Sequence, residues 1–376
     1  MTPSLLPFVA ALATTMLLPA QRPKILLTGY WPPSNEAIRH WSTNPAQNPG
    51  GWLGSDWESR GYDVHAYFPE FTPPTCTSCG TGNGDLTVDY QDTSADFWAI
   101  ADAIQPIAII TFSRSSTQVV WELEMNQYNR TVWVNDYVAP VQPTRSPPDA
   151  SVPADFLRPS LLPVQNIVTA ITVAGLPVNP YICWSGNGGG FLSEFIAYHG
   201  VWYQAVHASP TDPAWCVTAG HVHVGRSLSW ANARAAAEIT LREVILQVDA
   251  VRAATVCQQD LGFGGPGSAT LRACGQPLNQ NGNVADLRLL GGAPNTIGVL
   301  AFSDQVNPVP LFGGTVVTLP LLHTQLIVLD AAGEWFWDDG LVGFTGGFPT
   351  LSTQVGYLDA AQPQGWGLTN ALLLQF

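Results

Sequence analysis

Short apolar runs alternate with amphipathic stretches from residue 24 to about residue 254. Residues 24–31 and 107–112 have the length and apolar content of buried parallel strands. Residues 229–253 show the clearest helical period, with apolar positions on one face and Arg and Glu elsewhere. Further strands are expected at 62–67, 118–126, 178–184 and 216–224, and further helices at 51–60, 96–104, 162–174 and 191–204. This alternation predicts a three-layer α/β/α domain with a mostly parallel twisted sheet.

The pattern changes after residue 255, where short apolar runs are separated by Gly, Pro and Asn turns and no helical period appears. Strands are expected there at 286–290, 297–302, 314–320, 325–330 and 343–347. Such spacing is typical of a small all-β, sandwich-like domain. With 376 residues the chain exceeds the usual size of one domain. We therefore expect an α/β domain at 21–254 and a β-rich C-terminal module at 255–376.

The first 20 residues contain an uncharged apolar stretch that is too short to span a bilayer. Small residues follow near Pro19 and Ala20, which suits a signal peptide cleaved close to residue 20. A buried first helix is the alternative. The signal peptide predicts a secreted, periplasmic or cell-surface protein with no membrane span after its removal.

Six cysteines, an even number, favour disulfides in an exported protein. Cys76 and Cys79 form a CxxC in a turn-rich loop and predict a local disulfide, because no second CxxC completes a zinc site. Cys257 and Cys274 flank a Gly-rich stretch and predict a second bridge. The remaining pair would be Cys183 with Cys216. No metal and no cofactor are expected.

The chain is acidic, with a formal net charge of −14 and only 11% charged residues. Lys24 is its one lysine, and the arginines form no basic run. A phosphate backbone would be repelled, so nucleic acid is excluded as a partner. An unusual abundance of Trp (14 copies) together with a hydrophobic fraction of 46% indicates a packed protein and not a disordered one.

Three segments carry candidate chemistry. Ser193 follows a strand and a Gly-rich turn at the start of a helix, where backbone N–H groups favour developing negative charge; a plain N-cap role is the alternative. His221 and His223 share one face of a strand, as a general base or as a metal pair without an evident third ligand. Glu122 and Glu124 share a face in the same way, as an orienting carboxylate or as solvated charge.

In this order and spacing, the segments over residues 24–250 resemble pyroglutamyl peptidase I, the pyrrolidone-carboxylate peptidases of family C15. LLTGYWPPSN stands in place of the family's opening TGFxPFG loop. WELEMNQYN aligns with its ERxAxN segment, NGGGFLSE with its SAGxYxCN segment, and HVHVG with its FIHVP segment. The resemblance implies that Glu124 and His223 are catalytic and that Ser193 replaces the family's catalytic cysteine.

The resemblance also implies a binding site for a peptide or small acyl substrate. Its substrate-binding residues would be Tyr30, Trp31, Gln118, Asn129 and Phe191. Its oxyanion donors would lie in the turn at Gly188, Gly189 and Gly190. The chain departs from the family where an arginine becomes Gln118, where two phenylalanines become Tyr30 and Pro33, where an asparagine becomes Glu194, and where a proline becomes Gly225.

Three functions fit these residues. The first is an exported hydrolase that cleaves an amide or ester bond, such as that of an N-terminal pyroglutamate or a related acyl group, through Ser193, His223 and Glu124. The second is a catalytically inactive relative that serves as a binding or surface protein. In the third, the C-terminal part, which resembles a small β-module of exported planctomycete-type proteins, binds carbohydrate through exposed aromatic side chains, namely Trp335, Trp337 and Trp366.

Overall fold

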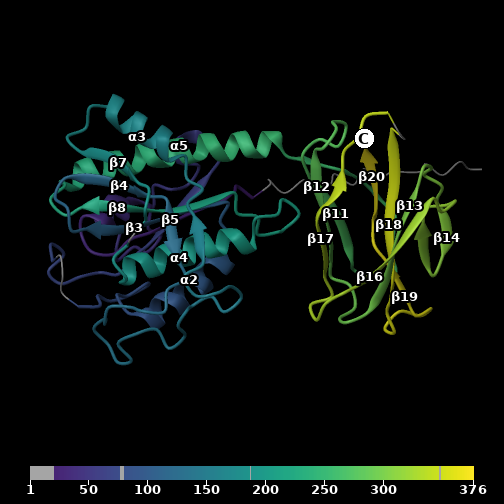
Figure 1. Cartoon of the computed structure of the whole chain (residues 1–376), viewed down its shortest axis with the longest axis horizontal. Helices are drawn as coiled ribbons and strands as arrows, with labels where there is room; N and C mark the ends of the chain where they lie inside the picture. Colours follow the sequence, from purple (N-terminus) through teal and green to yellow (C-terminus); the bar gives the residue numbers. More distant parts are fainter. Residues whose placement is uncertain (1–20, 77–79, 187, 347–348) are drawn as a thin grey trace, which may run out of the picture.

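The computed structural model describes residues 21–76, 80–186, 188–346 and 349–376. The predicted signal peptide lies outside these ranges. Figure 1 shows an α/β part joined through a long helix to a β-rich part. Among the described helices, none combines the length and apolar character needed to cross a membrane.

A six-stranded sheet forms the centre of the α/β domain, in the order β2-β1-β3-β8-β4-β7. Strands β2, β1, β3 and β8 are parallel, β4 is antiparallel to β8, and β7 is parallel to β4. The predicted mostly parallel sheet is therefore confirmed. The strands are β1 (Lys24–Thr28), β2 (Asp63–Tyr67), β3 (Ala108–Ser115), β4 (Val120–Glu124), β7 (Asn179–Cys183) and β8 (Thr218–Gly225), and a separate small sheet contains β5 (Asn126–Tyr128) and β6 (Leu157–Pro159).

Helices cover both faces of the sheet, which confirms the three layers (Figure 1). The helices are α1 (Ser34–Ile38), α2 (Tyr90–Ile104), α3 (Val164–Val173), α4 (Leu192–Val206) and α5 (Trp230–Ala254). Helices α1, α3 and α5 share one apolar core with Ile110 and Phe112 of β3, whereas α2 and α4 share a second core with Ile109. The alternation of side chains along β3 therefore assigns its odd-numbered residues to the face under α2 and α4.

Most predicted elements agree with the structure, but two do not. A helix was expected at 51–60, where the structure has one 3-10 turn, Trp57–Ser59, flanked by loop. Asp56, Glu58 and Ser59 have positive φ, which no right-handed helix accommodates. The strand expected at 343–347 is also wrong: the strand is β17 (Trp335–Val342), which ends where the Gly-rich stretch begins.

The C-terminal part is an antiparallel β-sandwich, which confirms the predicted all-β module. One sheet has the order β10-β20-β18-β13-β16 with β19 paired to β18, and the other has the order β17-β12-β11-β9. Both sheets supply side chains to one apolar core. The strands are β9 (Val256–Cys257), β10 (Gln259–Gly262), β11 (Thr270–Gly275), β12 (Val284–Leu290), β13 (Ile297–Ser303), β14 (Val309–Leu311), β15 (Gly314–Val316), β16 (His323–Val328), β17, β18 (Thr350–Leu358), β19 (Trp366–Leu368) and β20 (Ala371–Gln375).

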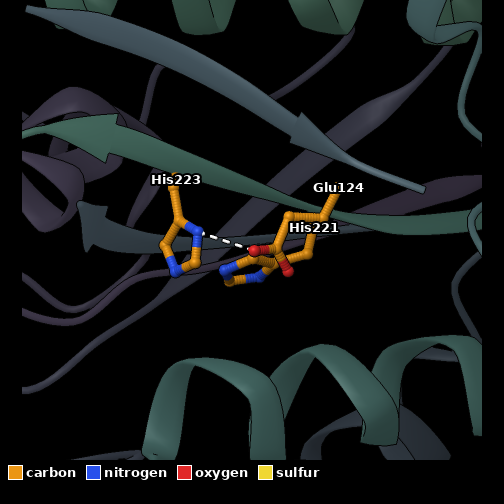
Figure 2. A group of neighbouring side chains, drawn as sticks. All are labelled: Glu124, His221 and His223. Carbon is orange, nitrogen blue, oxygen red and sulfur yellow. Dashed lines mark ion pairs between the residues drawn. The ribbon is translucent and has the colours of Figure 1, made fainter. Parts of the chain in front are cut away.

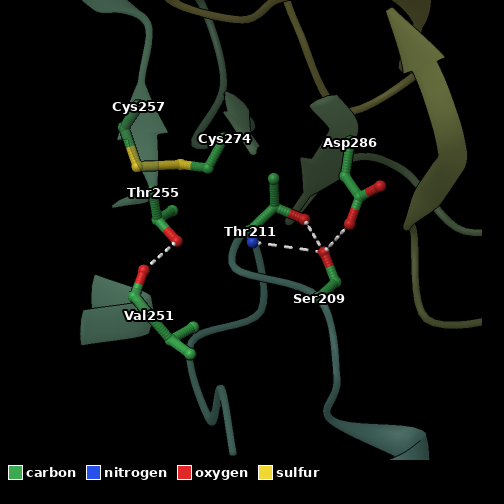
Figure 3. The surroundings of a disulfide bond; sticks show 7 residues. All are labelled: Ser209, Thr211, Val251, Thr255, Cys257, Cys274 and Asp286. Atoms are coloured by element: carbon green, nitrogen blue, oxygen red, sulfur yellow. Dashed lines mark hydrogen bonds between the residues drawn. A yellow bond between two sulfur atoms is a disulfide. The ribbon is translucent and has the colours of Figure 1, made fainter. Parts of the chain in front are cut away.

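A disulfide and a hydrogen bond stabilise the junction between the two parts (Figure 3). The predicted disulfide between Cys257 and Cys274 is present and ties the first strand after α5 to β11. Beside it, Ser209 Oγ donates a hydrogen bond of 2.6 Å to the Asp286 carboxylate in β12. The loop after α4 therefore contacts the sandwich directly.

The predicted bridge between Cys183 and Cys216 is wrong, because both are free thiols. Cys183 ends β7 and Cys216 precedes β8, and β4 lies between these strands. Neighbouring strands are about 4.8 Å apart, so two such steps exceed the roughly 7 Å that a disulfide allows between Cα atoms. Of the predicted pair Cys76 and Cys79, Cys76 is disulfide-bonded and Cys79 lies outside the described residues.

Candidate active site

Two rows of polar side chains cross the sheet on the face covered by α4. In one row Thr111 of β3, His221 of β8 and Glu124 of β4 are register partners. In the next row the partners are Ser113, His223 and Glu122. The rows extend onto β7 through Cys183 and Tyr181, respectively. Side chains two residues apart on a strand share a face, so all these groups project to the same side.

His223 and Glu124 form a buried ion pair (Figure 2). Nδ1 of His223 lies 2.9 Å from Oε1 of Glu124 and 3.8 Å from Oε2 of Glu122. His223 is 8% exposed and Glu124 only 1%. Within the described ranges, the Glu124 carboxylate has no hydrogen-bond donor other than His223, so His223 is the group that compensates its charge.

This pair sets the protonation of His223. Burial alone would lower the pKa of His223, but the negative charge of Glu124, with weaker contributions from Glu122 and Glu194, outweighs it and raises the pKa above its usual value. With Nδ1 facing Glu124, the proton of the neutral ring belongs on Nδ1, and Nε2 carries the free lone pair. That is the tautomer a general base needs.

His221 is held in a different way. Its Nδ1 is 2.7 Å from the Thr111 hydroxyl and its Nε2 is 2.8 Å from the Ser113 hydroxyl. Complete burial keeps the pKa of His221 well below its usual value, so the ring is neutral. It packs edge-to-face on His223, with 4.7 Å between ring centroids. His221 therefore supports His223 and has no nitrogen left over for catalysis.

The ligand atoms of Glu124, His221 and His223 all lie within 4.8 Å of one another, so this group has the composition of a cation site. The sequence showed no third ligand beside the two histidines. Glu124 takes that place, because the strand order puts β4 next to β8. A cation would have to displace a hydroxyl from His221, since both of its nitrogens are already hydrogen-bonded.

Ser193 lies in the first turn of α4, the helix that packs on β3 and β8. The helix approaches the sheet closely because Gly200 has no side chain: a Cβ there would lie 3.3 Å from the methyl group of Thr111. The Ser193 hydroxyl donates a hydrogen bond of 2.8 Å to the carbonyl of Gly188. The Ser193 hydroxyl is thus turned toward the preceding loop.

The glycine turn before Ser193 is shaped around Glu194. A Cβ on Gly188 would lie 2.5 Å from Cβ of Glu194, and Gly189 and Gly190 have positive φ. The N–H of Gly190, a predicted oxyanion donor, donates to Oε2 of Glu194 at 3.1 Å. Glu194 also forms an ion pair of 2.6 Å with Arg130, a residue that the sequence analysis did not identify.

Aromatic side chains form a wall beside this turn. Trp31 and Phe191 stack with 6.1 Å between ring centroids, and Tyr137 meets both edge-on at 6.3 and 6.4 Å. Tyr137 is 47% exposed, so the wall reaches the surface. The structure thus brings together two predicted binding residues and adds Tyr137, which lies in a proline-rich loop without any periodic signal.

The other predicted binding residues have different surroundings. Tyr30 is buried, and its hydroxyl is hydrogen-bonded to Thr93 at 2.8 Å. The Asn129 amide is buried. Its Nδ2 donates to the carbonyl of Asp149 and its Oδ1 accepts from the N–H of Asp149, which holds that loop in place. The side chain of Gln118 is exposed in the turn before β4. Their roles in substrate binding stay predictions.

No protein-family model matches the sequence, and no curated protein matches it. Among solved structures, the chain is similar to a mutant pyrrolidone carboxyl peptidase from Pyrococcus furiosus, with 14% identity, a TM-score of 0.43, and coverage of 60% of this chain and 99% of that one. It is similar to the pyrrolidone carboxyl peptidase from Thermococcus litoralis with 14% identity, a TM-score of 0.43, and coverage of 61% and 96%.

Proposed function

We propose that the chain is an exported hydrolase that cleaves an amide or ester bond through Ser193, His223 and Glu124. The observation that carries the proposal is the buried His223–Glu124 pair, with Nδ1 of the histidine on the carboxylate at 2.9 Å. Burying this charge costs several kcal/mol unless it is compensated, and a well-packed apolar pair would serve the fold as well. The pair therefore makes most sense as a base with its orienting carboxylate.

The proposed reaction begins when the Ser193 hydroxyl turns from the Gly188 carbonyl to Nε2 of His223. As Ser193 Oγ attacks the carbonyl carbon, its proton passes to Nε2, and the tetrahedral intermediate collapses as His223 returns that proton to the leaving amine or alcohol. Water then hydrolyses the acyl-enzyme by the same route. Glu124 stays ionised throughout and stabilises the imidazolium that forms twice per cycle.

The substrate proposed is a peptide with an N-terminal pyroglutamate or a related acyl group. The wall of Trp31, Phe191 and Tyr137 would contact the apolar part of that acyl group, since flat aromatic faces give large contact areas at little entropic cost. Export is proposed from the apolar N-terminal segment and agrees with the Cys257–Cys274 disulfide.

The test is covalent labelling of the purified protein with a fluorophosphonate, read by mass spectrometry, beside release of a chromophore from a pyroglutamyl amide. We expect the label on Ser193, and Ser193→Ala should lose both label and roughly a thousand-fold or more of turnover. Ser185→Ala is the matched control, because Ser185 is an exposed serine of the same loop. Turnover that is unchanged in Ser193→Ala would overturn the proposal.

A second candidate is a catalytically inactive binding protein on the same scaffold. It is favoured by one observation: the Ser193 hydroxyl and the Gly190 N–H are both satisfied within the loop. This candidate predicts no label and no turnover with any acyl substrate. Labelling of Ser193 would eliminate it.

A further inference from the structure

The β-module contains a cavity of about 320 Å³. Residues of β13, β18 and β19 line it, and their sheet lies on the side of the module away from the α/β domain (Figure 1). The β14–β15 hairpin and the segment after it cover the outer face of β13, β18 and β19 there. The cavity is at the small end of the range of ligand pockets, roughly 300–1,000 Å³. Its principal lining residues are Val299, Ala301, Phe312, Leu321, Gly356 and Trp366.

The lining is almost entirely aliphatic and aromatic, and of the described residues that form it none is charged. The Gln354 amide is fully used, because its Nε2 donates to the carbonyls of Thr315 and Thr369 and its Oε1 accepts from the N–H of Val317. Thr318 is different: its hydroxyl is buried, with the residue 1% exposed, and has no hydrogen-bond partner among the described residues. Because this hydroxyl has no accessible surface, the side chains that line the cavity offer a ligand no free hydrogen-bonding group.

One wall of the cavity depends on a strained residue. Phe312 and Gly313 form the two-residue turn between β14 and β15, with φ of 56° and 79°. Such turns favour Asn-Gly, and a bulky side chain at positive φ costs on the order of 1–3 kcal/mol. The ring of Phe312 stacks on Trp366, with 5.2 Å between centroids and 26° between planes. The strained backbone conformation therefore occurs at Phe312, whose side chain forms one wall of the cavity.

The cavity floor is open because of a glycine. A Cβ on Gly356 would lie 3.3 Å from Leu368 and 3.8 Å from the Trp366 ring, so a larger side chain would grow into the cavity. The inner face of the same strands is closely packed, since Leu300 and Val355 are fully buried in the sandwich core.

We propose that this cavity binds a small, neutral, apolar molecule of the type of a medium-chain alkane, alcohol or ester, whose hydrocarbon chain packs on the aliphatic and aromatic lining. A carboxylate fits poorly because no cation lines the cavity and the chain carries a net charge of −14. A sugar fits poorly because its many hydroxyls would find no free side-chain partner in the lining. Of the aromatic residues considered for sugar stacking, Trp335 and Trp337 pack against the sandwich core and only Trp366 reaches this cavity.

The test uses the full chain and the neutral fluorophore N-phenyl-1-naphthylamine, displaced by 1-decanol, by decane or by decanoate at pH 8. We expect decanol to displace the fluorophore, with decanoate at least ten-fold weaker. Thr318→Val should leave displacement by decanol and by decane unchanged, because the Thr318 hydroxyl is not accessible from the cavity. Leu326→Asn is the control for adsorption to the surface, since Leu326 is 68% exposed on β16 and does not line the cavity.

Two variants separate a binding role from a structural one. Gly356→Leu should fill the cavity and abolish displacement. Phe312→Asn should relieve the turn, so the Tm of the module stays equal or rises while binding falls at least ten-fold. The proposal is overturned if decanol displaces no fluorophore, if both variants bind as the parent does, or if Phe312→Asn lowers the Tm and leaves binding intact. Labelling of Ser193 is unaffected in every case, so this test stands apart from the hydrolase proposal.

Discussion

The α/β domain and the β-sandwich bury different chemistry. Beneath α4, the α/β domain encloses Glu124, His221 and His223, each at most 8% exposed. The apolar core of the sandwich consists of aliphatic and aromatic side chains. Its buried carboxylate, Asp286 of β12 with 8% exposure, lies at the junction and accepts a hydrogen bond from Ser209, whereas the Thr318 hydroxyl is neutral and has no partner among the described residues. Burying a charged group is tolerated only when the group is paired, whereas burying a neutral hydroxyl without a partner has a modest free-energy cost. The first region therefore depends on electrostatic partners, and the second depends on how its volume is filled.

The largest effect that tests this comparison is expected from His223→Ala. Removing the partner leaves Glu124 buried and uncompensated, which should lower the free energy of unfolding by about 3–5 kcal/mol. The double variant with Glu124→Gln should recover most of this loss. Urea unfolding measures both. Thr318→Val in the sandwich is the matched removal of a buried polar group and should change stability by less than about 0.5 kcal/mol. Equal losses in the two regions would contradict the comparison.

A second effect should be confined to the sandwich. The Cys257–Cys274 bridge closes a loop with a sequence separation of 17 residues, and its replacement by Cys257→Ser with Cys274→Ser should cost about 3 kcal/mol. Differential scanning calorimetry should show the loss in the transition of the β-module. Cys183→Ser is the control, since Cys183 is a free thiol, and it should leave both transitions in place. A loss of Ser193 labelling in the disulfide variant would show that the two regions are not independent.

The smallest effect is a dependence on pH that belongs to the α/β domain. Folding raises the pKa of His223. The contribution of the His223–Glu124 pair to the free energy of unfolding is therefore complete below about pH 6.5, and it is lost as the pH rises through the pKa of the folded state. Each unit of that shift is worth about 1.4 kcal/mol. Turnover should change in the opposite direction, because the base must be neutral, and kcat/KM should rise with a midpoint above pH 6.5. Glu124→Gln should move that midpoint down. A midpoint that is unaffected by Glu124→Gln would contradict the assigned roles.

The features that could be predicted from the sequence are those that depend on a local pattern of residues. Helix α5 was expected because its apolar residues recur with a helical period and Ser229 caps it, as the hydrogen bond from the N–H of Asn232 shows. The pairing of His223 with Glu124 was expected from the resemblance and is present. The bridge between Cys183 and Cys216 failed because no local pattern reveals that β4 separates their strands. The Phe312–Trp366 wall was not expected, since it joins a strained turn to a strand over fifty residues away.

The position of β8 has a consequence for how the chain is synthesised. In the order β2-β1-β3-β8-β4-β7, this strand is last in the sequence and fourth in space. Before Thr218–Gly225 has left the ribosome, the earlier strands can form only two separate ribbons, β2-β1-β3 and β4-β7. Insertion of β8 closes the gap and delivers both histidines to Glu124 in the same event. The nascent chain therefore carries no assembled acid–base pair until its sheet is complete, and the exposed edges of β3 and β4 are the surfaces that a chaperone would have to cover until then.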